Sequence, residues 1–185
     1  GGTDSVKRFS PAGLPKGDFI PSQSGGLMQP NAVVVRSFET DFQINPGVND
    51  AWYNPATVGQ GFLISVFPDI QQVFLAWFNF DVERPPEDVS AILGDPGHRW
   101  LTAQGPYEGD TANLTVFVTK GGVFDSAEPP TSTDPDGDGT ITLRFADCEN
   151  GLIDYDITSV NLQGIIPIER IALDNVPLCE TLNVP

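Results

Sequence analysis

Short runs of alternating apolar and polar residues, separated by glycine and proline, most strongly limit how this chain can fold. In residues 140–146, for example, Ile141, Leu143 and Phe145 fall on one face of an extended segment, and this period of two is that of a β-strand. No long window shows the apolar spacing of an amphipathic helix. The 19 glycines and 17 prolines supply turns between the runs. The pattern predicts an all-β protein.

Eight segments are predicted to be strands. Their ranges are 32–44, 62–67, 72–80, 99–104, 113–119, 140–146, 152–158 and 164–171. Because the connections are short and contain no predicted helix, we expect an antiparallel meander. We expect the eight strands to form a closed or partly open barrel, which removes exposed edges. A two-sheet sandwich is the alternative, because the alternation of apolar and polar residues fits both folds.

Three local features refine this prediction. Segment 72–80 is apolar on both faces, which predicts a central strand covered on both sides. Asn150-Gly151 is typical of a tight hairpin turn. Pro167 lacks a ladder donor, so its strand is expected at an edge or with a bulge.

The chain is predicted to hold one domain with an arm in front of it. Residues 1–31 are rich in glycine and proline and show little apolar periodicity, so we interpret them as an extended N-terminal arm. Residues 32–185 contain all the predicted strands and form the single β domain. A chain of 185 residues is long enough for one well-buried core.

The charge is strongly acidic. Asp and Glu number 25 against 9 Lys and Arg, which gives a net charge of −16. Such a surface repels phosphate backbones and anionic headgroups, so nucleic acid is not expected as a partner. No apolar stretch is long enough for a membrane-spanning helix, and membrane insertion is not expected either.

Cys148 and Cys179 are the only cysteines. An even, minimal count in an acidic chain rich in glycine and proline favours one disulfide between them, and two unrelated buried thiols are the alternative. A disulfide indicates an oxidising compartment. The start Gly1-Gly2-Thr3-Asp4 is consistent with removal of a signal peptide.

Several separated segments resemble a module that recurs in secreted proteins of Gram-negative bacteria and has no established activity. Residues 52–62, WYNPATVGQGF, are similar to its WYNPATSGQGF segment, and residues 99–105, RWLTAQG, are similar to its RWLTGQG segment. Shorter matches are GGVFD at 121–125 and FADC at 145–148. Trp52-Tyr53-Asn54 is also similar to the first strand of avidin-like barrels. The resemblance implies a secreted β module, and we expect an extracellular or periplasmic location.

An acidic segment predicts a calcium site. Residues 134–142, DPDGDGTIT, match the first half of an EF-hand-type loop, with Asp134, Asp136 and Asp138 at positions 1, 3 and 5 and the Thr140 carbonyl at position 7. Position 12 is Phe145, so the bidentate glutamate is missing, and Asp125 or Glu128 would have to complete the ligands. The alternative is a turn whose composition suits a hairpin connection.

The function expected from the sequence is binding or a structural role at the surface, without catalysis. Nucleophile-elbow, zincin, phosphate-loop and dinucleotide motifs are all missing from the sequence. Trp52, Tyr53 and Trp100 are the candidate ligand-binding residues, for carbohydrate, protein or a small apolar ligand. The alternative is a lipocalin- or avidin-like carrier of a small apolar ligand, and a hydrolase is a more distant one.

Overall fold

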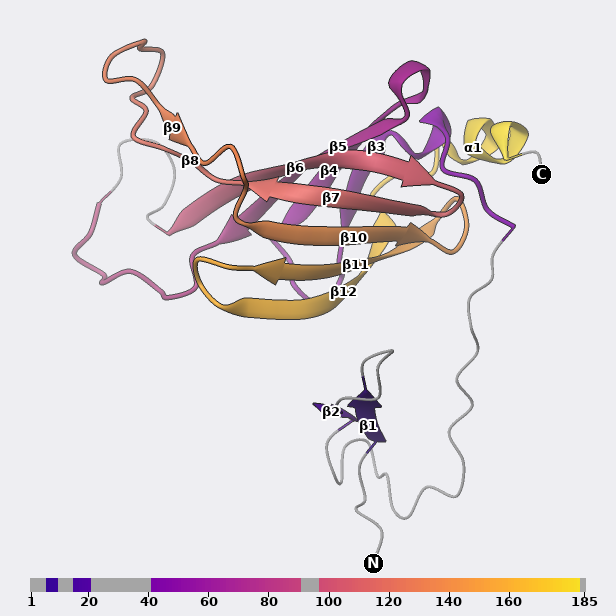
Figure 1. Cartoon of the computed structure of the whole chain (residues 1–185), viewed down its shortest axis with the longest axis horizontal. Helices are drawn as coiled ribbons and strands as arrows, with labels where there is room; N and C mark the ends of the chain where they lie inside the picture. Colours follow the sequence, from indigo (N-terminus) through magenta and orange to yellow (C-terminus); the bar gives the residue numbers. More distant parts are fainter. Residues whose placement is uncertain (1–5, 10–14, 21–40, 91–96, 184–185) are drawn as a thin grey trace, which may run out of the picture. The chain divides into compact units, whose positions relative to one another are not determined.

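A computed structural model describes residues 6–9, 15–20, 41–90 and 97–183 (Figure 1). The chain divides into two compact units, Gly1–Phe38 and Glu39–Pro185. In the first unit, β1 (Val6–Phe9) and β2 (Pro15–Ile20) pair as an antiparallel hairpin with an irregular register, where the sequence predicted only an extended arm.

Within the described part of the second unit, eight strands form a closed antiparallel barrel in the order β10-β11-β12-β3-β4-β5-β6-β7. Their bounds are β3 (Asp50–Tyr53), β4 (Gly61–Phe67), β5 (Gln72–Phe80), β6 (His98–Glu108), β7 (Thr111–Phe117), β10 (Gly139–Phe145), β11 (Asn150–Ile157) and β12 (Leu162–Arg170). The all-β barrel predicted from the alternation is confirmed, and the sandwich alternative is excluded because β7 pairs with β10 and β12 returns to β3.

The remaining elements lie at the two ends of the barrel. The 3₁₀-helix η2 (Pro46–Val48) precedes β3, η3 (Pro68–Ile70) joins β4 to β5, and α1 (Val176–Leu182) follows β12. The two-stranded sheet of β8 (Thr119–Lys120) and β9 (Ser132–Thr133) lies between β7 and β10 in the chain. Figure 1 shows α1 at one end of the barrel and β8 and β9 at the other. We name these the closed end and the mouth.

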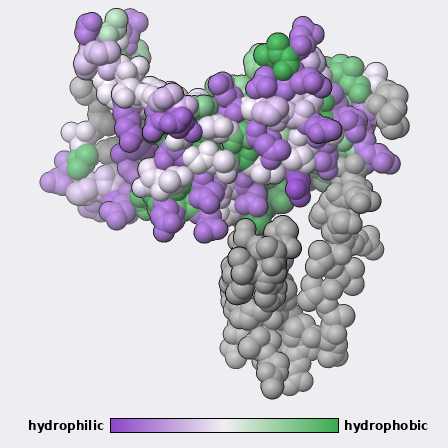
Figure 2. Space-filling view, viewed as in Figure 1, coloured by the Kyte–Doolittle hydropathy of each residue, from purple (hydrophilic) through white to green (hydrophobic). Residues whose placement is uncertain are grey.

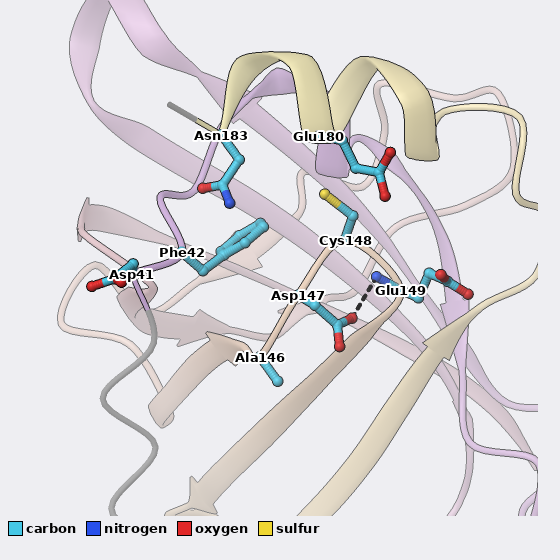
Figure 3. A pocket seen from close by; sticks show the side chains of 8 residues that line it. All are labelled: Asp41, Phe42, Ala146, Asp147, Cys148, Glu149, Glu180 and Asn183. Atoms are coloured by element: carbon cyan, nitrogen blue, oxygen red, sulfur yellow. Dashed lines mark hydrogen bonds between the residues drawn. The ribbon is translucent and has the colours of Figure 1, made fainter. Parts of the chain in front are cut away.

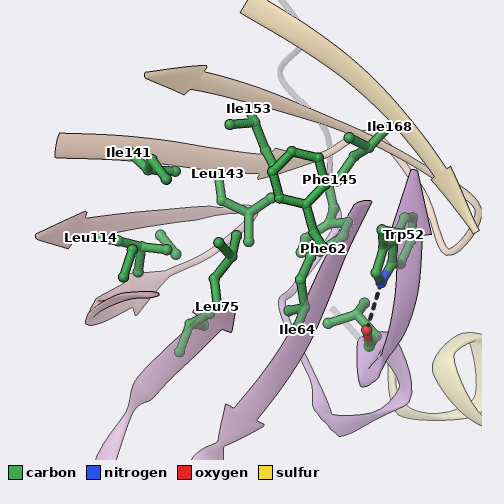
Figure 4. Close-up of a cluster of buried hydrophobic side chains, with 14 of the residues drawn as sticks. Trp52, Phe62, Ile64, Leu75, Leu114, Ile141, Leu143, Phe145, Ile153 and Ile168 are labelled. Carbon is green, nitrogen blue, oxygen red and sulfur yellow. Dashed lines mark hydrogen bonds between the residues drawn. The ribbon is translucent and has the colours of Figure 1, made fainter. Parts of the chain in front are cut away.

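Inward-facing side chains fill the barrel over most of its length. The alternation seen in the sequence is the burial pattern of the strands: in β10, Ile141, Leu143 and Phe145 are buried while Arg144 is exposed. Side chains from most of the strands converge on one cluster (Figure 4). An eight-stranded barrel is just wide enough for side chains to fill its interior. The core is therefore the inside of the barrel itself.

The outer face of β5 corrects one prediction. Phe78 and Phe80 are each 49% exposed, so β5 is not covered on both sides. A closed barrel has a single interior, and β5 turns Val73, Leu75 and Trp77 into it. The apolar residues of the other face therefore meet solvent.

The first barrel strand is β3, and the predicted strand 32–44 is wrong over its described part. Residues 41–45 are irregular, and residues 32–40 lie outside the described residues. Asn45 ends the extended path, because its side-chain oxygen accepts a hydrogen bond of 2.9 Å from Gly47 N and caps η2. A Cβ at Gly47 would lie 2.3 Å from the Cα of Cys179, so only glycine fits there.

The hairpin turn between β10 and β11 precedes Asn150-Gly151, which open β11 instead of forming the turn. The carboxylate of Asp147 accepts hydrogen bonds of 2.8 Å from the backbone N–H groups of Glu149 and Asn150. This Asx-type turn places the chain reversal at residues 146–149, before Asn150-Gly151. The turn also carries Cys148.

The barrel wall has a short seam between β12 and β3. Among the described residues, these strands are paired only at Glu169 with Tyr53 and at Arg170 with Trp52. The β3-facing side of β12 is therefore a local edge over residues 162–168. Pro167 lies in this stretch, as its missing donor predicted.

Arg170 joins the closed end across this seam. Its side chain is fully buried, and its Nη1 lies 2.7 Å from Asp50 Oδ2, at the start of β3. Nη2 donates to Gly47 O in η2 at 2.6 Å, and Nε donates to Cys148 O. The guanidinium also lies 4.6 Å from the ring centroid of Trp52, in cation–π geometry. One side chain thus connects β12, β3, η2 and the β10–β11 turn.

The Cys148–Cys179 disulfide attaches α1 to the same end, as the cysteine count predicted, with the Cα atoms 5.8 Å apart. Cys179 Cα also packs directly against Gly47, at the closest approach noted above. A loop of 31 residues closed in this way contributes about 3–4 kcal/mol in the chain-entropy model. The closed end is therefore fixed by a covalent bond and by a buried cation.

We expect Arg170→Met to lower the free energy of unfolding by about 3–5 kcal/mol, because it leaves the Asp50 carboxylate and two carbonyls without their donor. Urea unfolding followed by circular dichroism measures the loss. Arg144→Met, on the exposed face of β10, is the matched control and should change stability by about 0.5 kcal/mol or less. Equal losses in the two variants would contradict the role assigned to Arg170.

Candidate ligand site at the mouth of the barrel

A cavity of about 470 Å³ lies at the mouth, and we name it the mouth cavity. Inward-facing apolar residues from β5, β6 and β11 form its floor: Trp77, Leu101, Tyr155 and Ile157. Polar and charged residues line its rim: Gln60, Asn79, Asp81, Arg99, Lys120, Asp138 and Ser159. Exposed apolar side chains lie among them: Phe80, Val82, Trp100, Val160 and Leu162. An apolar floor with a few polar groups around it is the usual construction of a small-molecule site.

Trp77 separates the mouth cavity from the filled interior. It is 8% exposed, its ring centroid lies 5.2 Å from that of Phe62, and Tyr155 meets it edge-on at 5.2 Å. Below it, Val73 and Leu75 are fully buried. A ligand in the mouth cavity would therefore rest on the Trp77 layer and would not reach the barrel centre.

The rim carries two cationic and two anionic side chains, and one cation and one anion of these form an ion pair. Arg99 Nη2 lies 2.5 Å from Asp81 Oδ2. Asp138 accepts hydrogen bonds from Ser159, at 2.8 Å from the backbone N–H and at 2.6 Å from the hydroxyl. These pairs hold the loops after β5 and β11 beside the cavity, and they leave the amides of Gln60 and Asn79 at its edge.

A second cavity of about 220 Å³ adjoins the first at the seam between β12 and β3. Both cavities are lined by Gln60, Trp77 and Tyr155. Tyr155 pairs across the ladder with Gly164, where a Cβ would lie 2.9 Å from the phenol oxygen. Glycine at 164 therefore makes the room in which the tyrosine ring lies.

The three aromatic residues predicted to bind a ligand do not lie on one surface. Trp52 is fully buried at the closed end, where its Nε1 donates to Val48 O at 3.1 Å (Figure 4). Tyr53 is on the neighbouring position of β3 and points to the opposite side of the sheet. Trp100 is 57% exposed on β6, which two strands separate from β3. Only Trp100 lines the mouth cavity.

Tyr53 is engaged by its partner across the seam. A hydrogen bond to the Glu169 side chain, together with desolvation and the charge of that carboxylate, raises the pKa of Tyr53 above its ordinary value of 10.0. A neutral phenol hydrogen-bonded to a carboxylate supports the short β12–β3 ladder. This contact gives Tyr53 a structural role at the seam.

The predicted calcium segment forms a tight turn into β10. Asp134 Oδ1 accepts a hydrogen bond of 3.0 Å from Asp136 N, and Asp138 binds Ser159 as described. Gly137 and Gly139 have φ of +85° and +117°, and a Cβ at Gly139 would lie 1.9 Å from Asp156 O. The turn thus requires both glycines and uses Asp134 and Asp138 as hydrogen-bond acceptors.

These contacts fit the turn interpretation of the segment. In the described part of the chain, no three His, Cys, Asp or Glu side chains are grouped so that they could hold one metal ion. The side chains of Asp134, Asp136 and Asp138 therefore do not form such a group. Calcium binding stays a prediction.

A third cavity, of about 560 Å³, lies at the closed end beside the disulfide (Figure 3). Asp41, Asp147, Glu149 and Glu180 bring four carboxylates to its walls, and Phe42 is its main apolar side chain. This cavity is larger than the mouth cavity, but it has no apolar floor. We therefore place the candidate site at the mouth.

The sequence contained a signal for the mouth that the prediction did not use. Asn79 follows Trp77 on the same inward face of β5. A polar residue at an inward position marks the point where the filled interior ends. Lys120, Tyr155 and Ser159 also line the mouth cavity, but no local sequence pattern indicates this. They belong to segments that are brought together only when the barrel closes.

No protein-family model, no curated protein sequence and no solved structure matches this chain. Among the described residues, no helix is long and apolar enough to cross a membrane.

We expect Asp138→Ala to lower the melting temperature by about 2–4 °C in the presence of a chelator, because about 1 kcal/mol of hydrogen bonding to Ser159 is lost without any ion being involved. Asp136→Ala should change it little under the same conditions. If the loop also binds calcium, millimolar calcium will stabilise the native protein and Asp136→Ala will remove that gain. An unchanged melting temperature for Asp138→Ala in chelator would contradict the turn role.

Proposed function

We propose that the barrel is a non-catalytic binding domain that holds a small, uncharged ligand in the mouth cavity. The observation that carries the proposal is the cavity of about 470 Å³ with an apolar floor and a polar rim. Ligand sites in proteins commonly have volumes of about 300–1,000 Å³ and this distribution of side chains.

The filled interior limits the size and shape of the ligand. A carrier of long apolar molecules needs an open barrel, whereas here Trp77 and the residues below it occupy that space. The ligand would place one apolar face on Trp77 and Tyr155 and turn its polar groups toward Gln60 and Asn79. This is a smaller and more polar ligand than the apolar one considered from the sequence.

The charges favour a neutral ligand. The two cationic side chains of the rim, Arg99 and Lys120, are matched in number by two carboxylates, so the charges of the rim sum to zero. The net charge of −16 opposes the approach of anions. An uncharged molecule with hydrogen-bonding groups is not repelled by the net charge of the protein and needs no unpaired charge on the rim.

The two longest segments of the resemblance support the same site. Segment 52–62 contributes Asn54, Thr57 and Gln60 to the cavity at the seam, and segment 99–105 contributes Arg99 and Leu101 to the mouth cavity. These parts of the two segments therefore meet at the mouth, whereas Trp52 and the FADC match at 145–148 lie at the closed end. The disulfide supports export to an oxidising compartment as part of this proposal.

The outer face of the barrel provides a second candidate. Trp100 and Phe78 are paired across β5 and β6, and both are largely exposed, with Phe80 beside them. Exposed aromatic residues in one patch are typical of surfaces that bind sugars or other proteins. Trp100 and Phe80 also line the rim of the mouth cavity, whereas Phe78 does not, so a variant of Phe78 separates the two candidates.

Fluorescence titration with the neutral apolar probe N-phenyl-1-naphthylamine tests the proposal. We expect saturable binding of one probe per chain, weakened at least tenfold by Asn79→Phe, which fills the cavity from the rim without emptying the core. Phe78→Ser on the outer face is the matched control and should leave binding unchanged. Binding lost in Phe78→Ser and kept in Asn79→Phe would overturn the mouth site in favour of the outer patch.

A further inference from the structure

The mouth cavity is flanked by two further cavities, and we name the three together the groove. At the seam the mouth cavity shares Gln60, Trp77 and Tyr155 with the cavity of about 220 Å³. On the opposite side, a cavity of about 530 Å³ beside the 132–138 loop is also lined by Lys120 and Ser159, which belong to the mouth cavity. The shared lining residues show that the three cavities are neighbours at the mouth.

The chemistry changes along the groove. Aromatic rings are present in the middle, where Trp77 and Tyr155 lie. Asn54 and Thr57 line the seam end, and Ser132 and Thr133 line the loop end. Amide and hydroxyl side chains both donate and accept hydrogen bonds, and they match ligands whose groups do the same.

Carbohydrate has this combination of properties. A sugar ring presents an apolar C–H face that packs on an aromatic ring, and its hydroxyl edges pair with amide and hydroxyl side chains. A linear chain of such rings repeats the pattern along its length. A polyanion is opposed by the net charge of −16 and by Asp134 at the loop end.

We propose that the groove binds a linear, uncharged oligosaccharide, with one ring over Trp77 and Tyr155 and further rings toward the seam and toward the 132–138 loop. This inference rests on the proposed function, because its central ring occupies the mouth cavity. It adds two flanking subsites and a ligand class.

The proposal predicts that affinity increases with chain length. Isothermal titration of the full chain with β-1,4-linked glucose, N-acetylglucosamine and xylose oligomers, from one to six units, should show one series in which the hexamer binds at least tenfold more tightly than the monomer. Thr57→Trp and Ser132→Trp, which narrow the two ends, should each reduce hexamer binding at least fivefold. Thr142→Trp, on the outer face of β10, is the control and should reduce neither.

The outcomes separate this inference from the proposed function. If N-phenyl-1-naphthylamine binds but no series binds, or none shows length dependence, the oligosaccharide inference is overturned and the mouth site stands. If neither the probe nor a sugar binds, both fail. The inference would also be overturned if an uncharged extended peptide displaced the bound probe and none of the sugars did. That result would assign the groove to a peptide.

Discussion

Closure of the barrel depends on one buried cation. Because β12 and β3 are paired at only two positions among the described residues, the backbone ladder alone joins the last strand weakly to the first. Arg170 adds an ion pair to Asp50, hydrogen bonds to Gly47 O and Cys148 O, and a stacked contact with Trp52. A buried guanidinium is costly to desolvate, and here its donors are matched by acceptors on three different elements.

This concentration of contacts at one end allows the other end to stay open. The disulfide, η2 and α1 cover the closed end, so the loops at the mouth are not needed to complete the core. Trp52 belongs to the closed end and contributes to closure, whereas Trp77 is the last layer of the filled interior and forms a floor. The two tryptophans thus mark the closed end and the end at which we propose that ligand binds.

The strand pattern could be predicted from local sequence, and the partners of individual residues could not. Segment 72–80 is a strand with the predicted bounds, because alternation is a property of neighbouring residues. The prediction that Trp52 lies at a ligand surface missed its burial. Arg170, which covers the Trp52 ring, is far away in the sequence, so no local pattern indicates the contact. The strand β3 was missed because it is only four residues long and carries no clear alternation.

The acidic segment shows the same limit. Alternating aspartates with glycines suit a calcium loop and a tight turn equally well, and composition does not distinguish them. The turn became evident only from the approach of Gly139 to Asp156 and of Asp138 to Ser159, both on segments that follow later in the chain. The mouth cavity, too, is made by six separate segments, so only its floor on β5 had a local signal.

The central claim is that ligand binds at the mouth while the closed end is structural. The most direct test is to follow backbone amide shifts of isotope-labelled protein by NMR while N-phenyl-1-naphthylamine is added. The account predicts that the largest shifts fall at the mouth ends of β5, β6 and β11, around Asn79, Leu101 and Ile157. Largest shifts at the closed end, around Asp147 and Glu180, or along the exposed face near Phe78, would contradict it.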